Sequence, residues 1–511
     1  MRFPRASGVL LHLTSLPGPF GCGDLGPSAY HFVDWLGAAG QRLWQVLPIG
    51  SIGPGNSPYM SASAFAGNPL LIDLHQLATH GWLDHGNLAA HPSFPHQRVD
   101  YRGTIDYRME MLRRAEISFF GPQQEQSADR KLFTVFCEQE KTWLDDYALF
   151  MALSDMFPGK VWSEWEPALV QRKSHALHAA ARSLAEPVRF WKFTQWCFFR
   201  QWSALKRYAG ERGVSIIGDV PIFVGHQCAD VWSHQRLFRL GADLRPMVVA
   251  GVPPDYFSKT GQHWGNPLYN WDTMAGENYA WWVARLRTIC QLMDIVRIDH
   301  FRGFASCWEI PAEDTTAVRG HWVPGPGEKL FTAVEAALGK LPIVAEDLGV
   351  ITPDVTKLLA KLKFPGIRIL QFAFSDGADH PFLPHNYAPN TVVYTGSHDN
   401  DTSLGWFASA SPHERALAKK YLDCDGREIH WDLIRAAAYS VADMAIYPMQ
   451  DVLGLGSEHR MNHPGKARGC WEWRFTWDQV QPWHAERLYE ITAVTGRCAA
   501  DRLRFADEPT Q

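Results

Sequence analysis

The chain has 511 residues, of which 46% are hydrophobic and 20% are charged, so it can bury a large core as a globular protein. Its formal net charge of -5 provides no overall attraction to nucleic acid or to anionic membranes, and no apolar stretch reaches the length that crosses a bilayer. The 9 cysteines form no C-x-x-C pair, which excludes common disulfide and zinc frameworks and makes a reducing cytoplasm the simplest compartment.

Eight short apolar segments have the character of strands that are buried on both faces. Each is rich in leucine or β-branched residues, and most run into polar side chains. The first follows two arginines as a secretory signal would, but His12 interrupts it and no cleavage pattern follows, so a strand is the better interpretation. In chain order they are GVLLHLTSL (8–16), LWQVLPIG (43–50), SIIGDVPIFV (215–224), DIVRIDHF (294–301), LPIVAEDLG (341–349), GIRILQFAF (366–374), NTVVYTGSHDND (390–401) and MAIYPMQDVLG (444–454).

Helical patterns separate these apolar segments. Residues 187–213 predict a long amphipathic helix that Gly213 ends. Residues 411–422 predict a second helix, which begins with a capping box of Ser411 and Glu414. Because strands and helices alternate along the chain, the pattern predicts a parallel sheet with helical crossovers. Eight such units close most naturally into an α/β (β/α)8 TIM barrel.

Two connections are much too long for simple loops between a strand and a helix. We expect residues 60–195 to form an inserted, mainly helical subdomain between strands two and three. We expect residues 225–285, which are rich in Gly, Pro and aromatic side chains, to form a substrate-groove subdomain between strands three and four. Residues 1–511 then form a single catalytic barrel domain with insertions around its catalytic face.

The chain contains 22 tryptophans, and many of them are clustered. The apolar faces of sugars stack on aromatic rings, so the clusters indicate a carbohydrate groove. Packing in the core is the alternative for any single tryptophan, because most large aromatic side chains are buried.

Acidic side chains stand at the ends of three predicted strands. Asp299 ends the fourth strand, Glu346 the fifth and Asp401 the seventh, and barrel enzymes place their functional side chains at these ends. Retaining chemistry on a glycosidic bond needs a carboxylate nucleophile and a carboxylic acid. Arg297 points the same way as Asp299 and favours its ionised form, whereas Glu346 must have a raised pKa to hold its proton. The set therefore predicts a glycosidase-type site.

Asp401, His398 and His300 offer polar groups for the hydroxyls of the reacting sugar. Asp401 would brace the distorted ring beside the anomeric carbon. For any one acidic residue taken alone, a helix cap or an ion pair is the alternative role. The occurrence of R-I-D-H, A-E-D-L-G and S-H-D-N-D at successive strand ends favours the catalytic interpretation.

Several segments resemble a known enzyme family. RIDHF, AEDLG and GSHDNDT resemble the motifs of the α-amylase superfamily, and GDVPIFV looks like its strand-three motif. NSPYMSASAFAGNPLLI, GVPPDYFSKTGQHWGNPLYNW and RMNHPGKARGCWEWR resemble, more narrowly, the amylomaltases, which are 4-α-glucanotransferases also called disproportionating enzymes. The resemblance covers nearly the whole chain. It implies a barrel without the C-terminal β-sandwich of many α-amylases.

The resemblance also implies roles for particular residues. Asp299 would be the nucleophile, Glu346 the general acid/base and Asp401 the stabiliser of the transition state. The chemistry needs neither a metal cluster nor a phosphate-binding glycine motif, and the sequence shows neither, so we expect no metal and no organic cofactor. The positions that would line the glucan site are Tyr59, Asp219, Gln262, Trp264, Arg297, His300, His398 and Asn462.

Transfer and hydrolysis share a covalent glucosyl-enzyme and differ in whether a sugar hydroxyl or water resolves it. Residues 255–271, with Tyr256, Phe257 and Trp264, are the candidate wall of the acceptor side, which would exclude water. The resemblance favours transfer from maltooligosaccharides, starch or glycogen fragments to glucose or a glucan. An α-amylase-like or debranching hydrolase and a non-catalytic glucan-binding protein are the alternatives.

One position departs from the pattern of the family. Cys470 stands where the amylomaltases usually have Asn, so a hydrogen bond within the surrounding loop is expected to be lost. We expect neither a nucleic acid nor a membrane partner.

Overall fold

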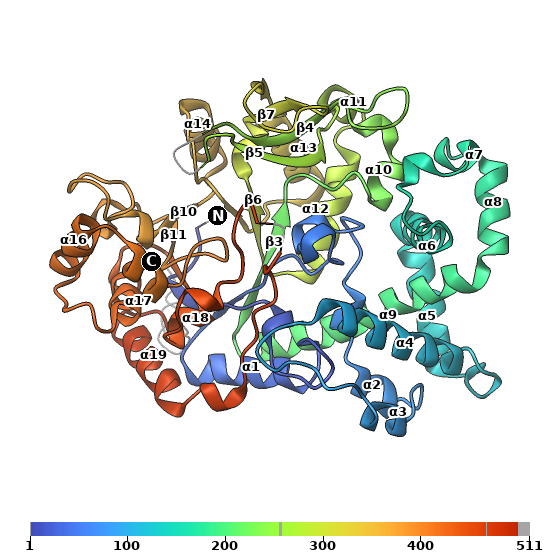
Figure 1. The fold of residues 1–511 in the computed structure, drawn as a ribbon, viewed down its shortest axis with the longest axis horizontal. Coiled ribbons are helices and arrows are strands. Elements are labelled where there is room, and N and C mark those ends of the chain that lie inside the picture. Colours follow the sequence, from blue (N-terminus) through green and yellow to red (C-terminus); the bar gives the residue numbers. More distant parts are fainter. Residues whose placement is uncertain (1, 255–257, 467, 499–511) are drawn as a thin grey trace, which may run out of the picture.

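The computed structural model describes residues 2–254, 258–466 and 468–498, and a barrel of parallel strands occupies its centre (Figure 1). The strands are hydrogen-bonded in the order β10-β11-β12-β1-β2-β3-β6-β9. Each lies within or next to one of the eight predicted apolar segments, so the predicted barrel is confirmed. Their bounds are β1 (Ala6–Leu10), β2 (Leu43–Gln45), β3 (Ser215–Pro221), β6 (Ile295–Asp299), β9 (Ile343–Ala345), β10 (Gly366–Ile369), β11 (Thr391–Tyr394) and β12 (Met444–Pro448).

Helices cover the outside of the barrel. They bury an apolar face against strands that are themselves buried, as a parallel sheet covered on both sides requires. Gly213 follows the long α9 with φ +71, and the capping box of Ser411 and Glu414 begins α16, as predicted. These helices are α1 (Pro27–Ala38), α9 (Ala185–Glu211), α12 (Ala280–Leu292), α13 (Glu328–Leu338), α14 (Pro353–Leu362), α15 (Ser403–Ser409), α16 (Pro412–Leu422), α17 (Ile429–Tyr439), α18 (Met449–Val452) and α19 (Pro482–Val494).

The first strand lies earlier in the chain than predicted. Ala6 pairs with Met444, so β1 begins before residue 8 and ends at Leu10. Beyond it, Leu13–Ser15 form a turn of 3-10 helix in which Leu16 N–H donates to the Leu13 carbonyl oxygen at 3.0 Å. The apolar run is therefore continuous in sequence, but it is divided between a strand and a buried turn.

The barrel has a seam between β9 and β10, where no strand ladder forms. One backbone bond crosses it, from Ala345 N to Pro365 O at 2.9 Å. The carboxylate of Asp347 replaces the missing ladder, because it accepts from Ile367 N at 2.7 Å and from Arg368 Nη1 at 3.1 Å. The side chain next to Glu346 in the sequence thus joins the two ends of the sheet.

Residues between β2 and β3 form a group of helices beside the barrel, on the right in Figure 1. Many of their aromatic side chains pack on one another; the Trp82 and Phe119 rings, for example, lie 4.9 Å apart. Core packing therefore explains these tryptophans better than a sugar groove does. Besides α9, the helices of this group are α2 (Leu74–Thr79), α3 (His85–Ala89), α4 (Tyr101–Phe119), α5 (Ala128–Gln139), α6 (Lys141–Met156), α7 (Pro167–Val170) and α8 (Ser174–Ser183).

A small antiparallel sheet lies above the barrel, with strand order β5-β4-β7-β8 (Figure 1). Two of its strands, β4 (Val248–Val252) and β5 (Gln262–Pro267), come from the connection between β3 and β6, together with α10 (Ala229–Ser233) and α11 (Trp271–Gly276). The other two, β7 (Ser306–Pro311) and β8 (His321–Pro324), follow β6. The sheet therefore places β5, with Gln262 and Trp264, beside the end of β6.

Short 3-10 helices complete the described chain. They are η1 (Leu13–Ser15), η2 (Pro54–Asn56), η3 (Pro58–Met60), η4 (Pro69–Leu71), η5 (Pro122–Gln124), η6 (Trp162–Glu164), η7 (Gln235–Leu237), η8 (Phe301–Phe304), η9 (Leu370–Phe372), η10 (Pro384–Asn386), η11 (Ser457–His459) and η12 (Trp477–Gln479). Within the described ranges, we find no helix that combines the length and the apolar character needed to cross a bilayer.

Candidate active site

A buried guanidinium organises the acidic ends of β3 and β6. Asp219 pairs with Arg297 in the strand register, and Asp299 follows Arg297 by two residues, so all three side chains point into the barrel mouth. Arg297 Nη1 donates to both carboxylate oxygens of Asp219 at 2.6 Å and to Asp299 Oδ1 at 3.0 Å. One cation therefore fixes two carboxylates.

The pKa of Asp299 is raised to about 6. Burial is the main cause; the Arg297 guanidinium opposes it, and the charges of Asp219 and Asp399 add to it. Arg297 favours the ionised form of Asp299, as expected, but its effect is smaller than that of burial. A pKa near 6 still leaves the carboxylate ionised at neutral pH, as a nucleophile requires.

Glu346 lies directly beyond β9, next to the end of β6. Its Oε2 accepts from His300 N and its Oε1 from Leu348 N, each at 2.7 Å. His300 has a left-handed backbone with φ 52, and this conformation directs its N–H at the carboxyl group. Burial, followed by the charge of Asp299, raises the pKa of Glu346 to about 8, against the effect of the two backbone bonds. The expected rise in pKa is therefore present.

Tyr59 and His398 form a stacked pair beside this centre. Their ring centroids lie 5.3 Å apart with an interplanar angle of 18°. The Tyr59 hydroxyl donates to Asp219 Oδ2 at 2.8 Å and lies 2.9 Å from His398 Nε2. Because the hydroxyl proton is given to Asp219, the hydroxyl accepts from His398 Nε2–H, so this ring nitrogen carries a proton.

The structure brings Asp399, rather than Asp401, next to Asp299. Asp399 Oδ1 lies 3.3 Å from His398 Nε2 and accepts from Asn462 Nδ2 at 2.6 Å. Although burial raises it, the pKa of Asp399 is lowered to about 2 by the charge of His398 and by these hydrogen bonds. The charge of Asp399 also raises the pKa of Asp299.

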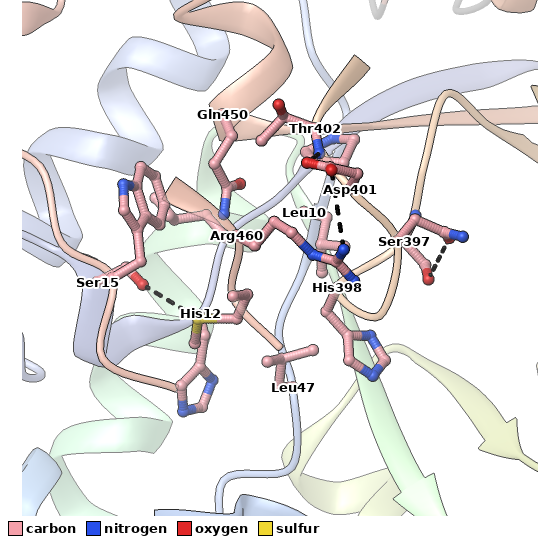
Figure 2. Close-up of a pocket in the computed structure, with 15 residues that line it drawn as sticks. Leu10, His12, Ser15, Leu47, Ser397, His398, Asp401, Thr402, Gln450 and Arg460 are labelled. Carbon is pink, nitrogen blue, oxygen red and sulfur yellow. Dashed lines mark hydrogen bonds and ion pairs between the residues drawn. The ribbon is translucent and has the colours of Figure 1, made fainter. Parts of the chain in front are cut away.

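Asp401, in the same loop after β11, contacts a different set of residues from Asp399. Its oxygens accept from Thr402 N at 2.8 Å and from Ser457 Oγ at 2.9 Å, and Arg460 Nη1 lies 3.8 Å away. Figure 2 shows it beside Thr402 and Arg460 in a pocket that His12 and His398 also line. The contact with Arg460 matches the ion pair that was the alternative role for a single strand-end acid, whereas Thr402, not Asp401, caps α15.

Asp399 is not among the site residues predicted from the sequence, although the sequence holds a signal for it. Two aspartates stand two residues apart in S-H-D-N-D, and Asp399 directly follows His398. The alternation that orients side chains in a strand does not apply here, because β11 ends at Tyr394 and the chain beyond it is irregular. Only the hydrogen bonds distinguish the two acids.

Gln262 and Trp264 come from the upper sheet. Trp264 Nε1 donates to Gln262 Oε1 at 3.0 Å, and the Trp264 ring meets the His300 ring edge-on with centroids 4.8 Å apart. Burial lowers the pKa of His300 to about 3, which keeps its imidazole neutral. Tyr256 and Phe257, the other candidate wall residues, lie outside the described residues.

Asn462 supports the site from the loop that contains Cys470. Its backbone N–H donates to the His398 carbonyl oxygen at 3.1 Å, in addition to its side-chain bond with Asp399. Cys470 Sγ accepts from His463 N at 3.4 Å. The loop bond that was expected to be lost at this position is therefore made by sulfur.

Comparisons with known proteins agree on one family. A family model described as 4-alpha-glucanotransferase matches residues 11–479. The 4-alpha-glucanotransferase of Thermus thermophilus is 50% identical over 97% of this chain and 100% of its own, and the chloroplastic/amyloplastic 4-alpha-glucanotransferase of Solanum tuberosum is 43% identical over 96% and 86%. The solved amylomaltase from Streptococcus agalactiae in complex with acarbose has a TM-score of 0.93 and 39% identity, covering 97% of this chain and 100% of that one.

Proposed function

The chain belongs to the 4-alpha-glucanotransferase family, and we propose that it transfers α-1,4-glucan segments through a covalent glucosyl-enzyme on Asp299. The observation that carries this mechanism is the pair of carboxyl groups with pKa values of about 6 for Asp299 and about 8 for Glu346. At neutral pH this order leaves Asp299 ionised and Glu346 protonated. These are the states that a nucleophile and a general acid need.

In the first half of the reaction, the Asp299 carboxylate attacks the anomeric carbon of the donor glucan. Glu346 gives its proton to the glycosidic oxygen, whose bond to that carbon breaks, and the leaving segment departs with a free hydroxyl. Arg297 and the hydrogen bonds around it hold Asp299 in place for the attack. The product is an ester between Asp299 and the donor segment.

In the second half, the 4-hydroxyl of an acceptor sugar attacks the same carbon. The Glu346 carboxylate takes the hydroxyl proton, and the ester bond to Asp299 breaks. Two inversions restore the α configuration. A sugar acceptor reacts in preference to water when the acceptor side binds glucose units and keeps their hydroxyls at high effective concentration.

We assign the third carboxylate role, bracing the reacting sugar, to Asp399. Its support by His398 and Asn462 and its effect on Asp299 favour it over Asp401. The residues that we propose as further sugar contacts around this centre are Tyr59, Asp219, Gln262, Trp264, Arg297, His300, His398 and Asn462.

The substrates that fit this chemistry are maltooligosaccharides and fragments of starch or glycogen as donors, with glucose or a glucan as the acceptor. Residues 60–195 and 225–285 would act as insertions that build the groove of a single barrel domain. The cysteine spacing supports a cytoplasmic location.

Incubation with maltotriose tests the reaction. Transfer yields glucose and a ladder of longer glucans while the total number of reducing ends stays constant. A steady rise in reducing ends would show hydrolysis instead, and an unchanged substrate would show a binding protein.

Variants of the two carboxyl groups test the roles. Asp299→Asn should lose turnover by at least about a thousandfold while maltooligosaccharide binding persists, because the nucleophile acts after binding. Glu346→Gln should lose activity on maltotriose but keep glucosyl-enzyme formation from donors whose leaving group needs no proton. Near wild-type turnover of maltotriose by Glu346→Gln would contradict the assignment.

A further inference from the structure

Trp471 has a backbone conformation that a bulky side chain rarely adopts. Its φ is 67, in the left-handed region, and its side chain is buried. The main chain on both sides holds it there, because Trp471 N donates to the Met461 carbonyl oxygen at 2.6 Å and the Trp471 carbonyl oxygen accepts from the Tyr101 hydroxyl at 2.8 Å. Such strained positions persist where the surrounding structure imposes them, and they concentrate at functional sites.

The indole of Trp471 contacts the two stacked rings of the candidate site. Its centroid lies 5.6 Å from that of Tyr59 and 5.9 Å from that of His398. With the 5.3 Å between Tyr59 and His398, the three rings form one mutually packed aromatic cluster. Tyr59 donates a hydrogen bond to Asp219 and His398 forms an ion pair with Asp399, and Trp471 packs on both of these rings.

The cluster limits how Tyr59 and His398 can turn. The Tyr59 hydroxyl must meet both Asp219 and His398 Nε2, and the imidazole must keep its edge toward Asp399. A ring packed against both of them removes rotations that would break these bonds. Hydrogen bonds in a pre-organised site act on the transition state without reorganisation, so this restriction bears on the rate.

The helical insertion supports this arrangement through a short backbone pairing. Arg98 forms an antiparallel bridge with Trp473, Val99 N donates to the Glu472 carbonyl oxygen at 2.7 Å, and the Tyr101 bond follows at the start of α4. The segment that places Trp471 is thereby fixed to residues far from it in sequence. The insertion therefore contributes to the site by holding this segment in place.

We propose that Trp471 is a positioning residue for transfer. Its backbone is strained and its indole is buried, and the indole fixes Tyr59 and His398 in the orientation that the reacting sugar requires. The proposal rests on the proposed function. It assigns to Trp471 no contact with the substrate.

Substitutions that keep apolar volume but differ in aromatic character provide the test. Trp471→Phe and Trp471→Leu both fill the space partly, and only Phe retains a ring to pack on Tyr59 and His398. We expect kcat for maltotriose disproportionation to fall at least tenfold in Trp471→Leu with KM changed less than threefold, and Trp471→Phe to recover to within fivefold of wild type. Trp165→Leu is the matched control, since Trp165 is equally buried but packs on Phe150, Phe157 and Trp232, none of them in the site.

The outcomes separate the two proposals. If wild type and Trp165→Leu disproportionate maltotriose and Trp471→Leu does so with a kcat within twofold of theirs, the positioning role is wrong. The positioning role is also wrong if lower thermal stability explains the loss of kcat in Trp471→Leu. In that case Trp165→Leu would lose as much kcat when the two variants are compared at equal stability. If wild type forms no ladder of glucans, the proposed function itself fails.

Discussion

At the scale of single residues, the site depends on two neighbouring carboxyl groups that have different protonation states at the same pH. Asp299 has a cation within hydrogen-bond distance, whereas Glu346 has only backbone N–H groups and lies close to the negative charge of Asp299. Desolvation raises both pKa values, and the cation limits the rise for Asp299. The difference in partners therefore sets the difference in role.

These pKa values predict a bell-shaped pH dependence of kcat/KM. Activity should rise as the pH increases through about 6, because Asp299 must lose its proton, and fall through about 8, because Glu346 must keep its own. The two limbs belong to the coupled pair rather than to either group alone. Initial rates on maltotriose from pH 4 to 10 measure the profile. In Glu346→Gln, assayed with an activated donor, the alkaline limb should disappear and the acidic limb remain.

The raised pKa of Glu346 also predicts a cost in stability. Between the ordinary value of 4.5 and about 8 the folded state binds more protons than the unfolded state, so the free energy of unfolding contributed by this group falls as the pH rises. Glu346→Gln removes the titration and should stabilise the protein by about 1 kcal/mol or more at pH 8, since one pKa unit corresponds to about 1.4 kcal/mol. Thermal unfolding at pH 5 and pH 8 measures it. The exposed Glu335→Gln is the control, and an equal gain at both pH values would contradict the explanation.

The two aspartates of the S-H-D-N-D segment should respond differently to substitution. Asp399→Asn should lower kcat by at least about a hundredfold, comparable with the loss of one electrostatic stabiliser of a transition state. Asp401→Asn keeps one acceptor oxygen for Thr402 N and places an amide NH2, which can donate, beside Ser457 Oγ, so it should change kcat less than about fivefold. Parallel assays on maltotriose compare them. The reverse order of losses would return the third role to Asp401.

At the scale of secondary-structure elements, the seam between β9 and β10 is the least paired part of the barrel. Asp347→Ala should leave Ile367 N–H without its acceptor and Arg368 without its carboxylate, at a cost of about 2–3 kcal/mol for the buried groups. Asp347→Asn keeps an oxygen for Ile367 N and should cost less than half as much. Urea unfolding of the two variants measures the difference, and equal losses would mean that the charge rather than the acceptor closes the seam.

The elements that could be predicted from the sequence are those whose signal lies within one short segment. The eight barrel strands are continuous apolar runs, and α16 has its cap within four residues, so both were found. The upper sheet was not predicted, because β6 and α12 separate its paired strands in the sequence. None of these strands shows a regular alternation of apolar and polar residues. Long-range pairing of this kind leaves little trace in short windows of sequence.

The same distinction applies to the candidate site. Asp299, Glu346 and Arg297 stand at or next to strand ends, where the topology of a barrel fixes their direction. Asp399 and Trp471 lie in irregular loops, and their roles depend on contacts with Tyr59 and His398, which no spacing reveals.

At the scale of the whole molecule, the buried guanidinium of Arg497 joins segments from both ends of the described chain. It donates to backbone carbonyl oxygens at the start of β1, at the end of α17 and in the turn before β12, and its side chain is fully buried. The acceptors lie 2.8–3.3 Å away and are Ala6, Ala438, Ser440, Ala442 and Asp443. The barrel is thus tied at the end opposite the catalytic face.

Arg497→Met should therefore lower the stability of the whole barrel rather than of one helix. Several buried carbonyl groups lose one charged donor at once, although Arg5 still donates to those of Ala438, Ser440 and Ala442, and we expect a loss of about 3 kcal/mol in a single cooperative transition. Arg427→Met, at a site where the side chain is 88% exposed, should change stability by less than about 0.5 kcal/mol. Calorimetry compares the two. A loss confined to an early, minor transition in Arg497→Met would show that Arg497 holds only a local segment.

The unequal pairing of the strands has a consequence for the two carboxyl groups they present. β6 is hydrogen-bonded along both edges and supports Asp299, the proposed nucleophile, which must attack the anomeric carbon from one direction. β9 is hydrogen-bonded by a ladder on one edge only, and in the proposed mechanism Glu346, which follows it, serves two oxygens in turn, first that of the departing sugar and then that of the incoming one. The proposed nucleophile therefore stands on a strand with a neighbour on each side, whereas the proposed acid/base follows a strand whose second edge is joined to β10 through Asp347.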